Sequence, residues 1–197
     1  MKNGYTALAF IGLSLCSLST AAQGDTTSFN WKFAEGNKLM EEKLYNSAAE
    51  LWLGLLPSDP DNANLNYKLG QSYFYSYNQK RKALPYFERA SQLRQPGNTG
   101  SFNSSGYDPF DNRERNAPVE LDYYLGRAYH LNLELDKADQ MYQKFMDQVD
   151  NKHSYWPLAH RGKEQVANAR ELMASPVPYE VFNAGAVINS EHPDFSP

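Results

Sequence analysis

The chain has 197 residues, a formal net charge of −4 and one cysteine, Cys16. A mildly acidic chain gains no attraction from phosphate backbones, which argues against nucleic acid as a partner. Because Cys16 lies within a predicted export signal that cleavage removes, we expect a mature chain without disulfides, thiol nucleophiles, Cys-rich zinc sites or iron–sulfur clusters.

The first predicted element is a signal peptide over residues 1–22. An apolar run follows Lys2, and Thr20 and Ala22 are the small residues that a cleavage site before Gln23 requires. The run has about 12 residues, whereas a membrane span needs about 20. A lipoprotein signal is an alternative, although a bulky leucine precedes the cysteine. We expect export to the periplasm or to the periplasmic face of the outer membrane.

Three segments that follow share the spacing of their small and aromatic residues. In each segment an alanine stands 12 or 13 residues after a glycine, and an aromatic residue stands four residues after that alanine. The first two glycines are 34 residues apart. The positions are Gly36, Ala48 and Trp52, then Gly70, Ala83 and Phe87, and finally Gly126, Ala138 and Tyr142.

The recurring glycines and alanines indicate close packing of helix pairs. A glycine inside a helix costs about 1 kcal/mol relative to alanine, so three in register need a packing reason. Residues four and seven positions after the alanine return to one helix face and can bury against the first helix. We therefore predict an all-α fold of helix hairpins, with the small residues where the paired helices approach most closely.

This spacing resembles the consensus of the tetratricopeptide (TPR) family, whose repeat length is also 34 residues. The resemblance implies a TPR-like helix-hairpin solenoid over residues 29–175, with repeats at about 29–62, 63–96 and 119–151. Repeat one has Lys32 and Glu35 where the family has bulky apolar residues, so its first helix should form the N-terminal edge. Repeat two has one extra residue in the turn between its helices, around residues 78–82.

Two further segments belong to the predicted array. Residues 97–118 are rich in Gly, Pro and Asn and are predicted to be a long loop inserted between repeats two and three. Residues 157–173 place small and apolar side chains on one helical face, which predicts a capping helix that closes the end of the array.

Residues 176–197 are predicted to form an extended stub. The segment from Gly185 to Ser190, followed by Pro193 and Asp194, resembles the start of a TolB-like, WD-type β-propeller blade. Together with the signal and the TPR repeats, it resembles envelope proteins of Bacteroidetes-type bacteria, some of which serve secretion. In these proteins a TPR domain precedes a propeller and an OmpA-like peptidoglycan-binding domain. The resemblance implies a truncated member of that class, and a flexible tail is the alternative.

The sequence offers no motif for chemistry. None of the four histidines has a metal-ligand spacing to a second ligand on one helix face. The phosphate loop, the dinucleotide-binding glycine motif and the nucleophile elbow are missing. We predict a non-enzymatic protein–protein interaction scaffold of the cell envelope without a cofactor. A self-contained periplasmic TPR adaptor or chaperone is the alternative, and an envelope hydrolase is a remote one.

TPR arrays bind peptides or partner helices in a concave groove lined by the first helix of each repeat. Alignment of the repeats predicts an aromatic groove with one cation, for other envelope proteins or peptides, and only indirect membrane association. Each aromatic residue could instead be a core contact. A clamp for a C-terminal carboxylate is not predicted, because only one position matches that pattern. The predicted groove residues are Phe33, Asn37, Met40, Tyr67, Gln71, Phe74, Tyr75, Tyr123, Arg127 and His130.

Overall fold

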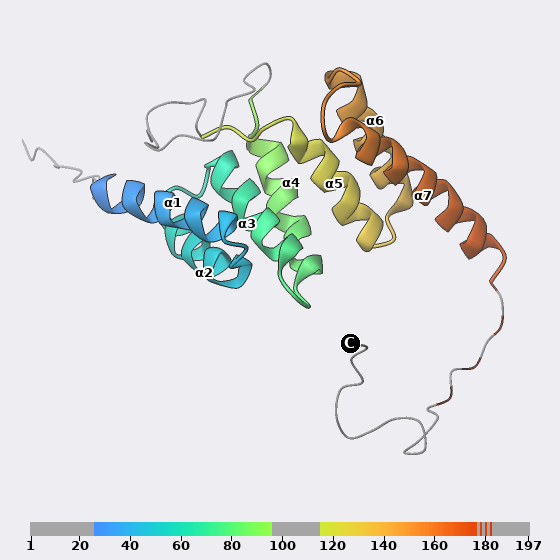
Figure 1. The fold of residues 1–197 in the computed structure, drawn as a ribbon, viewed down its shortest axis with the longest axis horizontal. Coiled ribbons are helices and arrows are strands. Elements are labelled where there is room, and N and C mark those ends of the chain that lie inside the picture. Colours follow the sequence, from blue (N-terminus) through green and yellow to red (C-terminus); the bar gives the residue numbers. More distant parts are fainter. Residues whose placement is uncertain (1–25, 96–114, 177, 179, 181, 183–197) are drawn as a thin grey trace, which may run out of the picture.

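The structure, a computed structural model, describes residues 26–95, 115–176, 178, 180 and 182. The predicted signal peptide, residues 96–114 of the insertion and most of the C-terminal stub lie outside the described residues. Within them every regular element is helical, and seven α-helices pack as antiparallel hairpins, which confirms the predicted fold class (Figure 1). The helices are α1 (Thr26–Glu41), α2 (Tyr45–Leu55), α3 (Ala63–Tyr75), α4 (Ala83–Leu93), α5 (Glu120–Leu131), α6 (Leu135–Gln148) and α7 (Trp156–Ala174).

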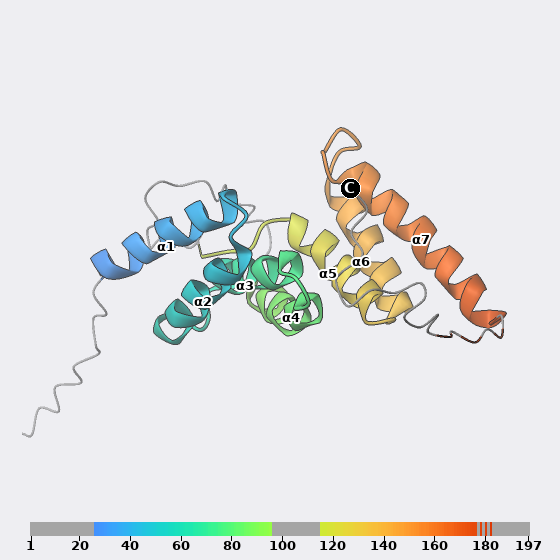
Figure 2. The same ribbon diagram turned by 60° about the horizontal axis from the view of Figure 1, so that its bottom comes forward.

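The helices follow one another in a row from α1 at one end to α7 at the other, as two views show (Figures 1 and 2). Each helix packs most extensively against its neighbours in the chain, so α1–α2, α3–α4 and α5–α6 form pairs at the three predicted repeats. None of the helices in the described ranges combines the length and the apolar character needed to cross a membrane.

Within each pair, the aromatic ring of the second helix occupies the space that a side chain on the glycine would need. A Cβ atom on Gly70 would lie 2.5 Å from the Phe87 ring, and one on Gly126 would lie 2.7 Å from the Tyr142 ring. The glycine of the first pair faces its tryptophan ring in the same way. Each glycine therefore leaves room for an aromatic ring of the second helix. The repeat alanines are fully buried, and their small side chains let the two helices pack closely. These alanines are Ala48, Ala83 and Ala138.

The turns inside the first and third pairs each contain one residue in the left-handed conformation. These residues are Lys43 and Leu133, each with φ of 62°. In the third pair, the N–H of Leu133 donates to the carbonyl of His130, and the next N–H donates to the carbonyl of Tyr129. This is the Schellman arrangement that ends a helix. The turn of the second pair is longer, spans residues 76–82 and includes the 3₁₀-helix η2 (Lys80–Lys82), in agreement with the extra residue found there.

Both ends of the insertion are attached to the array. The amide of Asn116 accepts a hydrogen bond from the backbone N–H of Gln95 and donates one to its carbonyl, at 2.9 and 3.1 Å. Beside it, the Arg115 guanidinium forms an ion pair with Asp59, in the turn after α2, at 2.5 Å. The insertion thus leaves and rejoins the array at one point, so α5 can stack on α4 as if the repeats were contiguous.

A buried carboxylate joins three helices. Asp122 of α5 is fully buried and accepts hydrogen bonds from Arg94 after α4 at 2.7 Å and from Lys144 of α6 at 3.0 Å. The Gln148 amide donates a further bond at 2.8 Å. Opposite charges and full hydrogen bonding offset the cost of burying an ionised group. We call these four residues the Asp122 cluster.

The helix α7 continues the packing pattern of the repeats. Gly162 also faces the Tyr142 ring, where a Cβ atom would lie 2.5 Å from it, so this tyrosine is held between the glycines of α5 and α7. Ala159 and Val166 are buried on the same face. The Arg170 guanidinium reaches back to Asp136 of α6 at 2.7 Å. The helix therefore covers the end of the third pair, where the capping helix was predicted.

Candidate protein-binding face

The first helices of the three pairs adjoin one another and form one face of the array, here called the α1–α3–α5 face. The Ser72 hydroxyl of α3 lies 2.9 Å from the Met40 sulfur of α1. On the other side of α3, the hydroxyls of Tyr75 and of Tyr124 in α5 are 2.7 Å apart. These contacts set the spacing between the helices that was predicted to line a binding groove.

Three polar side chains repeat along this face. Asn37, Gln71 and Arg127 each follow the glycine of their repeat, and all three are half-buried. All three were predicted to line the groove. Because they occupy the same position in their repeats, each of the three helices carries one of them. Two amides and a guanidinium at such positions can donate hydrogen bonds to the carbonyl groups of a bound segment.

Arg127 lies on an aromatic floor. Its guanidinium carbon is 4.5 Å from the centre of the Phe74 ring and 5.8 Å from that of Tyr123. Such stacking fixes the orientation of the guanidinium and leaves its edge available for a planar acceptor. Among the described residues, no carboxylate forms an ion pair with Arg127. The face thus presents an oriented positive charge.

Four of the aromatic residues predicted to line the groove are instead part of the core. Tyr67 and Tyr123 are only 6% and 5% exposed, and Phe33 and Phe74 are more deeply buried. The reason is that each ring meets the aromatic residue of a second helix, as when Tyr67 and Phe87 approach to 6.1 Å between ring centres. These residues form the floor of the face, and the groove assignment of their rings is corrected.

Other predicted groove residues keep accessible surface. Tyr75 is 39% exposed, and its ring stacks on Tyr45 at 5.2 Å between centres. Met40 and His130 are half-buried. Partial burial lowers the pKa of the His130 imidazole, which favours its neutral form at neutral pH. Arg127 therefore provides the permanent charge among the predicted groove residues.

Buried tyrosine hydroxyls link the helices beneath the face. Tyr124 lies 2.7 Å from the hydroxyl of Tyr75 and 3.3 Å from that of Tyr155, which precedes α7. The Tyr67 hydroxyl accepts a hydrogen bond from the Gln71 amide at 2.8 Å. Burial raises the pKa of Tyr67 and of Tyr124, so both phenols stay protonated and neutral. The network positions Gln71 and Tyr75, two of the accessible groups.

Sequence reasoning missed two residues of this region, Tyr124 and Lys68. Tyr124 follows Tyr123 directly, and helical periodicity does not distinguish which of two adjacent rings extends its hydroxyl toward α3. Lys68 lies in α3 with its ammonium 5.7 Å from the centre of the Phe33 ring. Burial lowers its pKa to about 8, an effect that the nearby Glu41 carboxylate partly opposes. In the sequence, Lys68 is marked only by its position two residues before Gly70, which does not indicate burial.

The described residues contain no group of three or more His, Cys, Asp or Glu side chains that could hold a metal ion. What the face offers is a set of hydrogen-bond donors, aromatic surface and one cation on a rigid helical support. Such groups recognise main-chain carbonyls, carboxylates and apolar side chains, which are the components of a protein segment.

Comparisons with known proteins identify the fold. No family model matches the chain, and no curated protein matches it. Among solved structures, the crystal structure of the Sgt2 TPR domain from Aspergillus fumigatus is similar, with a TM-score of 0.53 and 20% sequence identity. The similarity covers 81% of this chain and 93% of that domain. At this identity the likeness shows the fold alone, which is that of a TPR domain.

Proposed function

We propose that this chain, which has the fold of a TPR domain, is a protein-interaction module that holds a segment of a partner protein across its α1–α3–α5 face. The observation that carries the proposal is the repeated donor set on that face. Asn37, Gln71 and Arg127 occupy equivalent positions on three adjoining helices, above a floor of buried aromatic rings. TPR domains are typically interaction modules, and solenoid arrays bind partners along surfaces of this kind.

We further propose that the module works in a bacterial cell envelope. Support for this part comes from the sequence, through the apolar run after Lys2 and the small residues before Gln23. The resemblance of residues 185–194 to a propeller start supports a relation to the TPR, propeller and OmpA-like class. A self-contained periplasmic adaptor is the alternative form of the same function.

A photo-crosslinking experiment in the native host tests the binding face. Benzoylphenylalanine is placed at Gln71 on the face, or at Gln140 as a matched control on the outside of α6, where that glutamine is exposed. We expect Gln71 to give discrete protein adducts and Gln140 to give none. Adding Arg127→Ala to the Gln71 variant should reduce the adducts at least several-fold, because the fixed cation is lost.

Equal adduct patterns at the two glutamines would contradict the proposal, and so would an absence of adducts at both Gln71 and Asn37. The envelope part is tested separately by fractionation and by the mass of the mature chain. Export predicts a mature N-terminus at Gln23, whereas an intact N-terminus at Met1 in the cytoplasm would overturn the envelope assignment. Reading the nucleotides after the codon for Pro197 tests the proposed relation to the longer propeller-containing class.

A further inference from the structure

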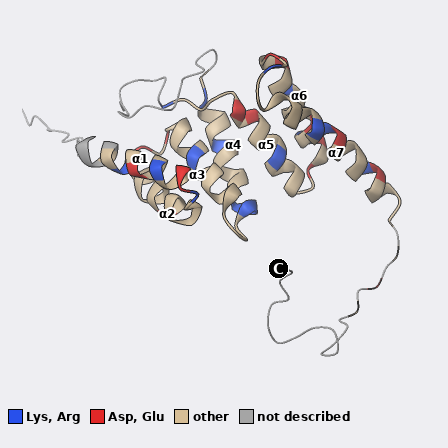
Figure 3. Cartoon of the chain, viewed as in Figure 1, with Lys and Arg blue, Asp and Glu red and all other residues tan. Residues whose placement is uncertain are grey.

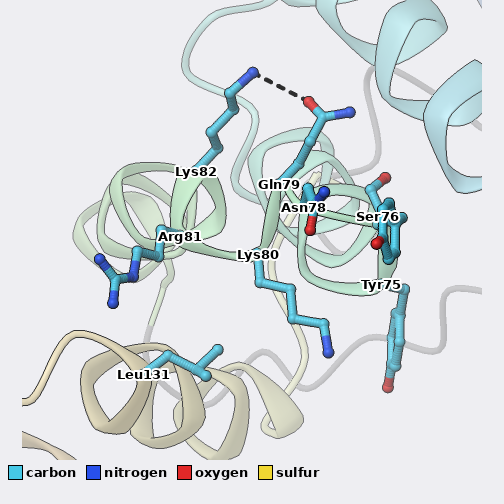
Figure 4. Close-up of a pocket in the computed structure, with 9 residues that line it drawn as sticks. Tyr75, Ser76, Asn78, Gln79, Lys80, Arg81, Lys82 and Leu131 are labelled. Atoms are coloured by element: carbon cyan, nitrogen blue, oxygen red, sulfur yellow. Dashed lines mark hydrogen bonds between the residues drawn. The ribbon is translucent and has the colours of Figure 1, made fainter. Parts of the chain in front are cut away.

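A second surface feature lies at the edge of the array, where the long turn of the second pair faces the end of α5. The pocket there has a volume of about 620 Å³ and is called the turn pocket (Figure 4). Pockets of about 300–1,000 Å³ accommodate ligands the size of a few side chains. Its lining residues are Tyr75, Ser76, Tyr77, Asn78, Gln79, Lys80, Arg81, Lys82 and Leu131.

The turn pocket is strongly basic. Its lining includes three consecutive cations from η2 and no acidic residue, and Figure 3 shows basic positions at this turn. Lys82 is engaged within the protein, because its ammonium donates to Gln79 at 3.1 Å and lies over the Tyr73 ring at 5.7 Å. Lys80 and Arg81 are exposed and form no ion pair with the described residues.

The side chains of Lys80 and Arg81 leave the turn in different directions, whereas Lys82 turns to Gln79 (Figure 4). Two unneutralised cations therefore border the opening of the pocket, in a chain whose net charge is −4. Neither charge is offset by an acidic residue in the lining. The charge of the pocket is complementary to an acidic ligand.

Apolar surface accompanies these charges. Tyr77 is 84% exposed, and Leu131 and Tyr75 are each more than one third exposed. Exposed aromatic and aliphatic side chains beside arginine are characteristic of protein-binding surfaces. Among the helix pairs that the structure describes, the long turn that lines this pocket belongs to the second pair. The corresponding turns of the first and third pairs are the short segments 42–44 and 132–134, which contain no 3₁₀-helix.

We infer that the turn pocket is a docking site for an acidic protein segment, in which carboxylates pair with Lys80 and Arg81 around an apolar side chain that contacts Tyr77 and Leu131. Membrane-binding basic clusters usually hold four to eight cations on an open surface, whereas this site has two unpaired cations around a concavity. Nucleic acid is disfavoured by the acidic net charge. The turn pocket shares Tyr75 with the α1–α3–α5 face, and neither proposal requires the other.

A direct binding measurement tests this inference on the full chain. The probe is a fluorescein-labelled peptide, Glu-Asp-Leu-Phe-Asp-Glu, and its uncharged partner is Gln-Asn-Leu-Phe-Asn-Gln. The double variant Lys80→Ser, Arg81→Ser should raise the Kd of the acidic peptide about tenfold, as expected from losing two exposed charge pairs. The matched double variant Lys152→Ser, Arg161→Ser removes two exposed cations elsewhere and should change the Kd less than about twofold.

The proposal is overturned if the acidic peptide does not bind, if the uncharged peptide binds equally well, or if both double variants weaken binding alike. Binding of phosphatidylglycerol vesicles that depends on Lys80 and Arg81, without peptide binding, would replace it with a lipid site. Arg127→Ala separates the two surfaces, since it should reduce crosslinking from Gln71 and leave peptide binding at the turn pocket intact. Thermal unfolding of each variant checks that the fold is retained.

Discussion

At Gly70 the absence of a side chain is required by the ring that faces it. A Cβ atom there would lie 2.5 Å from Phe87, and Phe87 is itself fully buried and cannot swing out. Gly54, in α2, is also helical, but a Cβ atom there would meet nothing within 4 Å. A side chain added at Gly70 would therefore clash with a buried ring, whereas one added at Gly54 would meet no neighbour.

We predict that Gly70→Ala lowers the free energy of unfolding by about 1–3 kcal/mol, because overpacking against Phe87 outweighs the better helix propensity of alanine. Gly54→Ala, the matched control, should raise it by up to about 1 kcal/mol. Urea unfolding of both variants measures the difference. Equal stabilisation by the two substitutions would show that the ring does not constrain Gly70.

Lys68 gives the protein a pH-dependent stability. Its pKa in the folded chain, about 8, lies below the ordinary value of 10.5, so between these values the unfolded chain binds more protons. The free energy of unfolding therefore rises with pH across this window. We predict that Lys68→Met stabilises the protein by about 2 kcal/mol at pH 7, and that its advantage shrinks as the pH approaches 10.

Denaturant unfolding at pH 7, 8.5 and 9.5 measures this effect, with Lys152→Met as an exposed control that should leave the pH profile of the parent unchanged. The upper limit of the range matters, because the pKa of Tyr67 is raised by burial and its ordinary value is 10.0. Above pH 10 the unfolded chain ionises this tyrosine first, and stability falls. A constant difference between the Lys68→Met variant and the parent at all three pH values would contradict the prediction.

At the scale of elements, the Asp122 cluster determines how the second and third pairs join. The carboxylate belongs to α5, and its partners come from the end of α4 and from α6. Removing one member of a buried ion pair leaves its partner uncompensated, which costs far more than losing an exposed pair. Arg94 is 14% exposed at its side chain, so its charge would be left poorly solvated.

We predict that Asp122→Asn lowers the free energy of unfolding by about 3–5 kcal/mol. The control is Asp136→Asn, which breaks the ion pair with Arg170 between α6 and α7 but leaves both groups in solvent, and should cost at most about 1 kcal/mol. Chemical denaturation measures both values. Similar small losses would mean that the cluster contributes little to the junction.

At the scale of the whole molecule, we expect each helix to be stabilised mainly by the helices next to it in the row. Each helix packs mainly on the helices next to it in the chain, so a disturbance at one end should fade toward the other. The α7 end offers a test, because Gly162 contacts Tyr142 while Gln165 on the same helix is exposed.

We predict that Gly162→Leu destabilises the array by about 1–3 kcal/mol through overpacking, whereas Gln165→Leu, which places the same side chain on the exposed face, does not. Hydrogen exchange should accelerate most in α6 and α7, less in α5, and not measurably in α1 and α2, since the coupling passes from neighbour to neighbour. Uniform acceleration over all seven helices would instead indicate a single cooperative unit.

Much of this architecture follows from local sequence rules. The glycine, alanine and aromatic spacings predicted three helix pairs, because each requirement is met between helices that are adjacent in the chain. The extra residue in the second pair marked the turn that contains η2, and Gly162 belonged to the face predicted for the capping helix. In each case, steric fit within a hairpin or at its end decides the outcome.

The sequence by itself determined the helical repeats, their order and the small residues between paired helices. Only the tertiary structure decided that Tyr67 and Tyr123 are buried, that Asp122 gathers partners from two other helices, and that two cations border a pocket beside Leu131. The physical reason is that helical periodicity assigns a side chain to a face, but the curvature and stacking of the array decide whether a neighbouring repeat covers it.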